Sequence, residues 1–212
     1  SSDLLVRHIP GSPTVVIQNM PGASGVVAAN YMANVAPKDG SAISALFPAN
    51  VVEPLFETGA SIKYDPRTLA WIGNIDSLQL SCLMNAKSGV KSIDDARTRE
   101  VLVGATSPLS SSAFLPNVMN QLIGTRFKVL TGYSTGDLAL AFERNEINGI
   151  CGTAYSTLQQ SQPQWLKDKS LTFIAQSGVK PIADLPGVPM VADFATTPED
   201  KAVFRLLDMR VA

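Results

Sequence analysis

The sequence predicts an α/β protein with mainly parallel sheets. Two observations lead to this fold class. Strand-like and helix-like apolar patterns alternate along nearly the whole chain, and neither an internal repeat nor a low-complexity linker interrupts them. Such alternation is typical of βαβ units, in which a helix connects two parallel strands. The 212 residues suffice for one large domain or two small lobes, with ample apolar material for a core.

Eight segments have the short, apolar composition that is typical of strands. They are residues 13–18, 42–47, 68–74, 79–85, 101–104, 127–131, 148–152 and 171–176. Because helical patterns separate most of these segments, we expect their pairing to be mainly parallel.

Helical periodicity is clearest in three segments, residues 23–36, 112–123 and 135–145. In the first, Val27, Tyr31 and Val35 recur at every fourth position, which predicts that they share one face of a helix. The corresponding apolar positions of the second and third segments are Leu115, Val118, Met119 and Leu122, and Leu138, Ala141 and Phe142.

A glycine-containing segment, Asn19 to Gly40, follows the first predicted strand. Gly22 and Gly25 bracket the start of the helix that this segment contains. At a helix start, unpaired backbone N–H groups and the helix dipole favour an anion. Taken alone, the segment therefore predicts an anion site.

Four loops that follow predicted strands are rich in small hydroxyl, amide and glycine residues, and none contains Lys or Arg. They are residues 48–50, 104–112, 131–137 and 152–157. Each precedes a predicted helix and could simply cap it, since Ser, Thr, Asp and Asn are preferred N-caps. Together, however, they favour a site that binds a small anion through uncharged donors at the carboxyl ends of strands.

Composition argues against several classes of function. The net charge is −1 and no basic run occurs, so nucleic acid is not an expected partner. His8 is the only histidine, and the sequence contains no Gly-x-Ser-x-Gly elbow, P-loop or Gly-x-Gly-x-x-Gly motif. No Cys/His spacing is typical of a metal site. We therefore expect a binding protein without enzymatic activity, cofactor or metal.

The chain has two cysteines, Cys82 and Cys151, each inside an apolar run. They could be two buried thiols that act as small apolar residues. They could also form a disulfide in an oxidising compartment, if their strands are neighbours. The sequence leaves both interpretations open.

An ordered set of motifs extends over nearly the whole chain. These motifs are Asn19-Met-Pro-Gly-Ala-Ser-Gly25, Ala36-Pro-Lys-Asp-Gly40, Tyr64-Asp-Pro-Arg67, Trp71-Ile-Gly-Asn74, Val103-Gly-Ala-Thr-Ser-Pro-Leu-Ser110, Gly132-Tyr-Ser-Thr-Gly-Asp137, Glu143-Arg-Asn-Glu-Ile-Asn-Gly149 and Asp184-Leu-Pro-Gly-Val-Pro189. In order and spacing they resemble the signature of the solute receptors of tripartite tricarboxylate transporters, the TctC/Bug-type periplasmic binding proteins. Within this resemblance, residues 19–40 are better interpreted as a packing and turn signature than as an anion site.

The resemblance implies a two-lobe periplasmic-binding-protein architecture of type II, the Venus flytrap. The first lobe would comprise residues 1–76 plus 177–212, and the second lobe residues 77–176. Compared with the family, the chain looks truncated at both ends, which would leave the first lobe incomplete. We therefore expect the chain alone to bind ligand weakly or not at all, unless a homodimer covers the exposed core of the first lobe.

By the same resemblance, the protein is expected to be a periplasmic receptor that binds a small organic carboxylate between its lobes. It would deliver this ligand to the integral-membrane permease of the transporter. Backbone amides, hydroxyls and waters, rather than an arginine, would hold the carboxylate. The ligand-binding residues carried over in this way are Asn50, Ser107, Ser110, Ser111, Tyr133, Ser134, Thr135, Asp137, Thr153 and Tyr155.

Two alternatives stay open at this point. Asp137 could cap the helix predicted at residues 135–145, or it could face the ligand. The same two-lobe architecture also serves as the ligand-sensing, effector-binding module of regulators, which is the alternative to a transport receptor.

Overall fold

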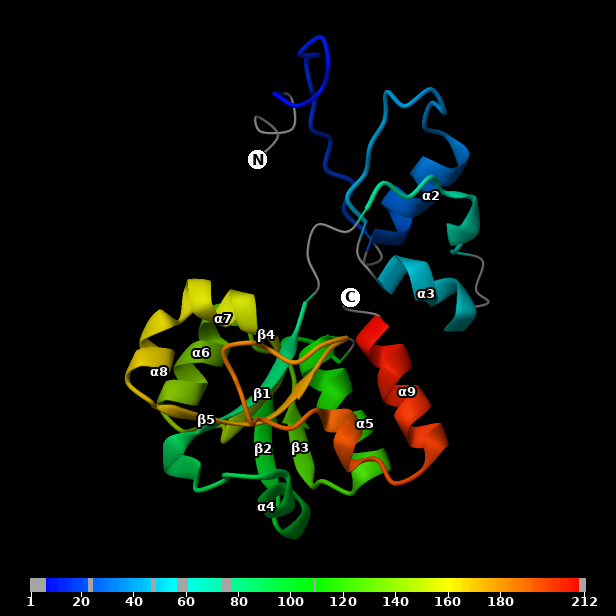
Figure 1. Cartoon of the computed structure of the whole chain (residues 1–212). Coiled ribbons are helices and arrows are strands. Elements are labelled where there is room, and N and C mark those ends of the chain that lie inside the picture. The colour runs from blue at the N-terminus through cyan, green and yellow to red at the C-terminus, as the bar shows by residue number, and fades with distance from the viewer. Residues whose placement is uncertain are drawn as a thin grey trace. The chain divides into compact units, whose positions relative to one another are not determined.

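The computed structural model of the chain describes residues 7–22, 25–46, 49–56, 61–73, 78–108 and 110–209 (Figure 1). The chain divides into two compact units, residues 1–72, here called unit 1, and residues 73–212, here called unit 2. Each unit has apolar core clusters of its own.

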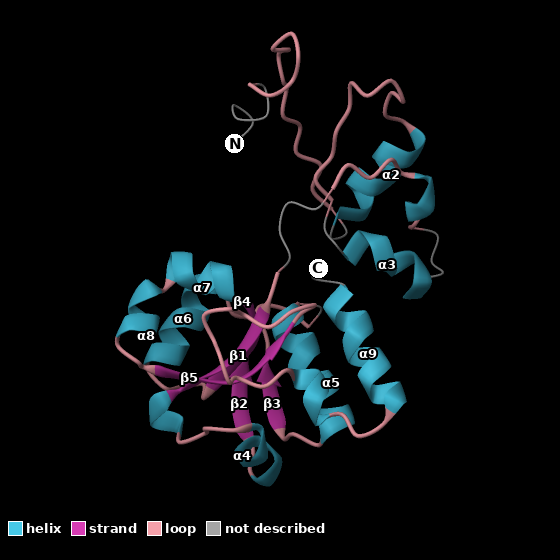
Figure 2. Ribbon diagram, viewed as in Figure 1, coloured by secondary structure: helices cyan, strands magenta, loops and turns pink. Residues whose placement is uncertain are grey.

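Unit 2 is built on a five-stranded sheet with the strand order β3-β2-β4-β1-β5 (Figure 2). The strands are β1 (Leu80–Asn85), β2 (Val101–Gly104), β3 (Phe127–Leu130), β4 (Gly149–Ala154) and β5 (Leu171–Ser177). The helices of this unit are α4 (Ile93–Thr98), α5 (Ser111–Ile123), α6 (Thr135–Glu143), α7 (Tyr155–Ser161), α8 (Pro163–Lys167) and α9 (Pro198–Met209), with 3₁₀ turns η3 (Ala86–Ser88) and η4 (Val191–Phe194). All five strands and the two helices predicted for this part of the sequence are confirmed.

The sheet is mixed, whereas the sequence predicts mainly parallel pairing. β2 pairs in parallel with β3 and with β4, but β1 pairs antiparallel with both β4 and β5. β1 alone therefore runs against the other four strands. The connections explain this difference. Helices link β2 to β3, β3 to β4 and β4 to β5, and a helical crossover returns the chain in the same direction. A helix, α4, also lies between β1 and β2, but these two strands run in opposite directions, so that connection is not a parallel crossover.

The core of unit 2 lies on both faces of the sheet. One apolar cluster joins the sheet to α4, α5 and α9, and the other joins it to α6, α7 and α8 (Figure 1). The alternation of side chains along a strand produces this division. In β1, Cys82 and Met84 belong to the first cluster, and Leu83 between them belongs to the second.

The two cysteines form a disulfide in the structure. Cys82 of β1 lies directly opposite Cys151 of β4 in the antiparallel ladder, and both residues are fully buried in the first cluster. The bond joins strands whose cysteines are 69 residues apart in the sequence. Of the two interpretations that the sequence leaves open, the structure has the disulfide.

Residues 178–209 pack against the sheet of unit 2. The lobe bounds expected from the resemblance, residues 1–76 plus 177–212 and residues 77–176, stay a prediction. Phe204 of α9, which is 1% exposed, and Val191 of η4 are buried in the same cluster as Ile174 of β5 and Met119 of α5. The physical reason is apolar burial, because the sheet face beside α5 is where these side chains leave water.

Unit 1 contains the helices α2 (Val26–Asn34) and α3 (Ala49–Phe56) and the 3₁₀ turn η2 (Pro66–Thr68). Its small core consists of Val26 and Ala29 of α2 together with Tyr64. The helix predicted at residues 23–36 is confirmed as α2, but Val27 and Val35, which the periodicity predicts on one face with Tyr31, are 46% and 68% exposed, so that face is not the buried one. The buried positions of this helix are Val26 and Ala29.

The three strands predicted for unit 1 are wrong over their described residues. Residues 13–18, 42–46 and 68–73 have no strand assignment, and residues 47 and 74 lie outside the described residues. Val16 and Ile17 of the first segment are 77% and 67% exposed. A strand needs a hydrogen-bonded neighbour as well as a suitable composition, and the described residues of unit 1 supply no such ladder.

The Asn19–Gly40 segment makes turn and packing contacts in the structure. Gly22 has a φ of +134°, and a Cβ atom there would lie 2.9 Å from a methyl group of Val27, so a glycine is required. At the other end, the Lys38 ammonium group donates to the carbonyl oxygens of Met32 and Ala33 in the last turn of α2. Residues 23 and 24 lie outside the described residues.

No helix in the described part of the chain is both long and apolar enough to cross a membrane. Within the same residues, no group of three His, Cys, Asp or Glu side chains is placed to hold a metal ion.

Asp208 provides a test of how α9 is attached to the sheet. Its carboxylate is 8% exposed and accepts a hydrogen bond of 2.5 Å from the hydroxyl group of Ser177 at the end of β5. Burial raises the pKa of Asp208 above its ordinary value of 3.8, while hydrogen bonds from Ser177 and the Gly178 backbone oppose the rise. The folded state therefore favours the protonated carboxyl group more than the unfolded chain does.

We predict that Asp208→Asn stabilises unit 2 increasingly as the pH rises. The raised folded-state pKa means that the contribution of Asp208 to stability is fully present below pH 3.8 and is lost as the pH rises through the folded-state value. The free energy of unfolding, measured by denaturant titration, should thus favour the variant more at neutral pH than near pH 3.8. Glu199→Gln, an exposed charge on the same helix, serves as the control. A pH-independent difference, or a difference that shrinks as the pH rises, would contradict this prediction.

Candidate ligand-binding site

Three of the four predicted polar loops meet at one edge of the unit 2 sheet. They follow the carboxyl ends of β2, β3 and β4, which the parallel pairing aligns. The backbone N–H of Ala105 donates to Leu130 at 2.8 Å, which joins the first two loops. The hydroxyl group of Ser111 donates to the carbonyl of Gly152 at 2.9 Å, which joins the first and third. Nine of the ten predicted site residues lie in these loops or in the first turns that follow them.

The serine-rich loop before α5 is held in shape by its own hydroxyl groups. The Ser110 hydroxyl donates to the Ser107 carbonyl at 2.7 Å and lies 2.9 Å from the Ser112 hydroxyl. The Ser107 backbone N–H donates back to Ser110 at 3.3 Å. Leu109 of this loop lies outside the described residues. The hydroxyl groups thus fix the backbone that leads into the helix.

The N-terminus of α5 has the properties that suit an anion at this edge. The helix is 13 residues long and has no acidic residue in its first turn. The backbone N–H groups of Ser111 and Ser112, in that turn, have no acceptor within the helix. The helix dipole adds partial positive charge at the same end. An anion at this edge would therefore meet uncharged donors that are already oriented.

Gly152 allows β4 to pass close to the start of α5. Its φ is +79°, and a Cβ atom there would lie 2.3 Å from the Ser111 carbonyl oxygen. Any larger residue would thus push the serine-rich loop away from β4. The next residue, Thr153, is half-buried, and its carbonyl accepts from the Ser81 hydroxyl at 3.2 Å.

The loop before α6 carries the one acidic member of the predicted set. The Asp137 backbone N–H donates to the Ser134 hydroxyl at 3.2 Å, and that hydroxyl donates to the Asp137 carboxylate at 2.6 Å. Asp137 therefore has the contacts expected of a residue that stabilises the start of a helix. Thr135 is exposed beside them, and Tyr133 is half-buried against the cluster beside α6.

Tyr155 begins α7, directly after β4. Its ring contacts the ring of Phe173 in β5 edge-on, with 5.9 Å between the ring centres. Burial raises the pKa of the Tyr155 hydroxyl, and the nearby negative charge of Asp184 and a hydrogen bond to that carboxylate raise it further. Asp184, which belongs to the Asp184–Pro189 motif, also accepts a hydrogen bond of 2.9 Å from the side-chain amide of Gln159 in α7.

Asn50, the remaining predicted residue, belongs to unit 1, whereas the other nine belong to unit 2. Asn50 is 1% exposed, and its backbone carbonyl accepts from the Tyr64 hydroxyl at 2.8 Å. It therefore helps to join α3 to the segment that precedes η2. Residue 48 of the same predicted loop lies outside the described residues.

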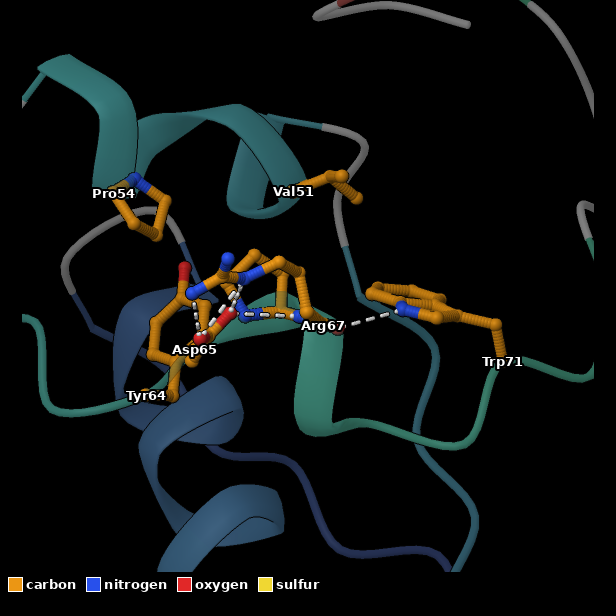
Figure 3. A pocket seen from close by; sticks show the side chains of 7 residues that line it. Val51, Pro54, Tyr64, Asp65, Arg67 and Trp71 are labelled. Carbon is orange, nitrogen blue, oxygen red and sulfur yellow. Dashed lines mark hydrogen bonds and ion pairs between the residues drawn. The ribbon is translucent and has the colours of Figure 1, made fainter.

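Unit 1 contains a pocket of about 610 Å³ that the sequence analysis did not predict (Figure 3). Its lining residues are Val51, Pro54, Tyr64, Asp65, Pro66, Arg67 and Trp71. Arg67 is paired with Asp65 at 2.6 Å, and Trp71 donates from its indole nitrogen to the Pro66 carbonyl at 2.9 Å. The pair neutralises the guanidinium charge, so this pocket is less suited to an anion than the edge beside α5. The Tyr64–Arg67 motif and Trp71 were its signal in the sequence.

Solved structures of known proteins share this fold. The adipate-bound protein Rpa4515 of R. palustris has 21% identity and a TM-score of 0.60, over 92% of this chain and 64% of its own. A TctC solute-binding protein from Polaromonas, without ligand, has 15% identity and a TM-score of 0.69, over 98% of this chain and 76% of its own. The malate-bound MatC of Rhodopseudomonas palustris has 16% identity and a TM-score of 0.52, over 92% and 71%. At these identities the likeness shows the fold alone.

The fold is shared with a solute-binding protein of known structure, and a sequence-family comparison makes the relationship specific. The model of the tripartite tricarboxylate transporter family receptor matches residues 7–197. The chain therefore belongs to this receptor family, as its motifs predict. It spans 64% of the length of the adipate-bound relative. A comparison with curated proteins gives no match.

We predict that Asp137→Asn lowers the stability of unit 2 by about 0.3–1 kcal/mol, because it removes a negative charge from the first turn of α6. Ligand preference should stay unchanged if helix capping is the whole role of Asp137. Asp168→Asn, an equal change at the C-terminal end of α8, should cause no such loss. Denaturant titration measures the stability and a thermal-shift series the preference. An altered preference with intact stability would show that Asp137 faces the ligand instead.

Proposed function

We propose that this protein is a periplasmic receptor that binds a small organic carboxylate and delivers it to the integral-membrane permease of a tripartite tricarboxylate transporter. The observation that carries this proposal is the polar edge of unit 2. There the N-terminus of α5 and three uncharged loops converge at the carboxyl ends of β2, β3 and β4.

The chemistry of this edge suits a carboxylate that must later be released. Backbone N–H groups and hydroxyls can satisfy the lone pairs of a carboxylate, and the helix dipole compensates part of its charge. An arginine would add a charge-assisted, bidentate pair, which is stronger than a bond to a neutral donor. Neutral donors therefore favour reversible capture over very tight retention.

The ligand contacts that we propose in unit 2 come from the three loops. The carboxylate would lie against the backbone of Ser111 and the serine-rich loop, with Tyr133, Thr135 and Tyr155 around it. The remaining proposed residues are Ser107, Ser110, Ser134, Asp137 and Thr153. Asn50, in unit 1, completes the proposed set.

The solved relatives guide the choice of ligands to test. One contains adipate and another contains malate, so both bound molecules are dicarboxylates. Membership of the receptor family favours a transport receptor over the effector-binding module of a regulator. The homodimer expected from the sequence stays a prediction. Val16 and Ile17 of unit 1 are exposed apolar residues that such a dimer would cover.

The proposal is tested by a thermal-shift and calorimetry series with mono-, di- and tricarboxylates, including adipate and malate. A ligand that binds only the folded state raises its stability, by about 2.7 kcal/mol at a concentration of one hundred times Kd. We predict that Ser111→Ala weakens binding of the best ligand about fivefold, because it removes the hydrogen bond to Gly152 that holds the backbone N–H groups at the start of α5 in position.

Ser161→Ala is the matched control. Ser161 is also exposed, and its hydroxyl donates to the Thr157 carbonyl at 2.8 Å, much as that of Ser111 donates to Gly152. The control should leave the affinity unchanged. Stabilisation at millimolar concentrations alone would agree with the weak binding expected of this chain, and absence of stabilisation in both the monomer and a homodimer would contradict the proposed function. Equal affinities for the wild type and Ser111→Ala would contradict the proposed location of the site.

A further inference from the structure

Strand β4 contains a β-bulge at the polar edge of unit 2. Cys151 of β4 pairs with Cys82 of β1. The next pair along the two strands is Thr153 with Ser81, so Gly152 has no partner in β1. An extra residue of this kind is left out of the ladder and bends its strand. The φ of Gly152, +79°, is a conformation that glycine adopts readily.

The bulge joins β4 to the start of α5. The Gly152 carbonyl accepts from the Ser111 hydroxyl at 2.9 Å. The two backbones also touch, since a Cβ atom on Gly152 would collide with the Ser111 carbonyl. The position of the bulge therefore determines where the backbone N–H groups of Ser111 and Ser112 point.

Side chains of β1 hold the bulge at both of its ends. At one end, the disulfide joins Cys82 to Cys151. At the other end, the Ser81 hydroxyl donates to the Thr153 carbonyl at 3.2 Å. Ser81 and both cysteines are fully buried, so water does not compete for these contacts. Two adjacent residues of β1 thus fix the two ends of the bulge.

The ladder of β1 is irregular at the disulfide. The register of β1 with β4 shifts between Ser81 and Cys82, and its register with β5 shifts between Cys82 and Leu83. Cys82 therefore lies where the pairing is interrupted on both sides of β1. A covalent bond at this residue fixes β4 against β1 at the place where the hydrogen-bonded ladder does so least.

We propose that Cys82 and Cys151 are positioning residues, whose disulfide holds the bulge so that the start of α5 is placed to bind a carboxylate. The effect on binding rests on the proposed function, whereas the coupling of the disulfide to the start of α5 does not. The polar edge is thus fully formed only in the oxidised protein, which suits a protein that works in an oxidising compartment. When the bond is broken, the bulge relaxes and the Ser111 contact loses its support.

The coupling is tested in the unliganded protein by backbone amide NMR. Oxidised protein is compared with protein that has been unfolded and refolded with dithiothreitol. This dithiol breaks the S–S bond, supplies two electrons and two protons to form two thiols, and leaves as its own cyclic disulfide. The Ser111 and Ser112 amides should shift on reduction, although both are distant from the cysteines in the sequence, while the amides of α8 stay unchanged. Unchanged Ser111 and Ser112 amides overturn the inference, whether or not the protein binds a carboxylate.

Ser81→Ala tests the same coupling with the disulfide intact. It removes the hydrogen bond at the other end of the bulge, so the same two amides should shift. Ser170→Ala is the matched control, because the Ser170 hydroxyl also donates to a backbone carbonyl, that of Trp165, at 3.3 Å. If the reduced protein does not refold, this pair of variants decides. Ser111 and Ser112 amides that are the same in Ser81→Ala as in the wild type show that the bulge does not position α5, which overturns the inference.

The effect on binding is measured by calorimetry with adipate and malate as probes. Reduction should weaken binding of the tighter probe about fivefold, and should have no further effect in Ser111→Ala, because the disulfide acts through the Ser111 contact. A disulfide that only stabilises the fold would lower the free energy of unfolding and leave the affinity of the folded protein unchanged, which would overturn the inference. If the oxidised protein binds neither probe while the amides shift as expected, the proposed function fails and the coupling stands.

Discussion

The parallel pairing of β2 with both β3 and β4 determines where the polar loops of unit 2 lie. Parallel strands present their carboxyl ends at the same edge of a sheet, so the loops that follow them must converge there. The glycine at position 152 then lets β4 approach the start of α5, and the Ser111 hydroxyl joins the two. Without this pairing, the helix N-terminus and the other two loops would not share one site.

Antiparallel pairing of β1 has a separate role, which is to bind the sheet together. β1 lies between β4 and β5, and the Cys82–Cys151 disulfide joins it covalently to β4. A disulfide that closes a long loop stabilises a fold mainly by restricting the unfolded chain. The edge that carries the loops therefore rests on strands that are fixed both by the ladder and by a covalent bond.

Much of unit 2 could be predicted from the sequence, because its patterns and its tertiary contacts agree. The face formed by Leu138, Ala141 and Phe142 is buried as the periodicity predicts. Other features depend on information that local patterns lack. The disulfide depends on the register between two strands, and the burial of Phe204 depends on which sheet face α9 covers. In unit 1, residues 13–18 have the composition of a strand, but composition supplies no hydrogen-bonded neighbour.

The candidate site shows the same division between what is local and what is tertiary. Runs of Ser, Thr and Gly before helices are visible in the sequence, and three of the four predicted loops meet in space. Which hydroxyls are engaged within the protein could not be predicted. The hydroxyls of Ser110 and Ser111 donate to backbone carbonyls of the protein. In the proposed binding, backbone N–H groups therefore make more of the contacts with the ligand than these hydroxyls do. The hydrogen bond from Gln159 to Asp184 could not be predicted either, because it joins segments that are distant in the sequence.

The central claim, that an anionic ligand binds at the edge beside α5, is tested most directly by mapping backbone amide NMR shifts during titration with adipate or malate. We predict that the largest shifts occur at Ser111 and Ser112, with smaller ones in the loops after β3 and β4, while the amides of α8 stay unchanged. Shifts concentrated instead around Tyr64, Arg67 and Trp71, in the pocket of unit 1, would contradict the account.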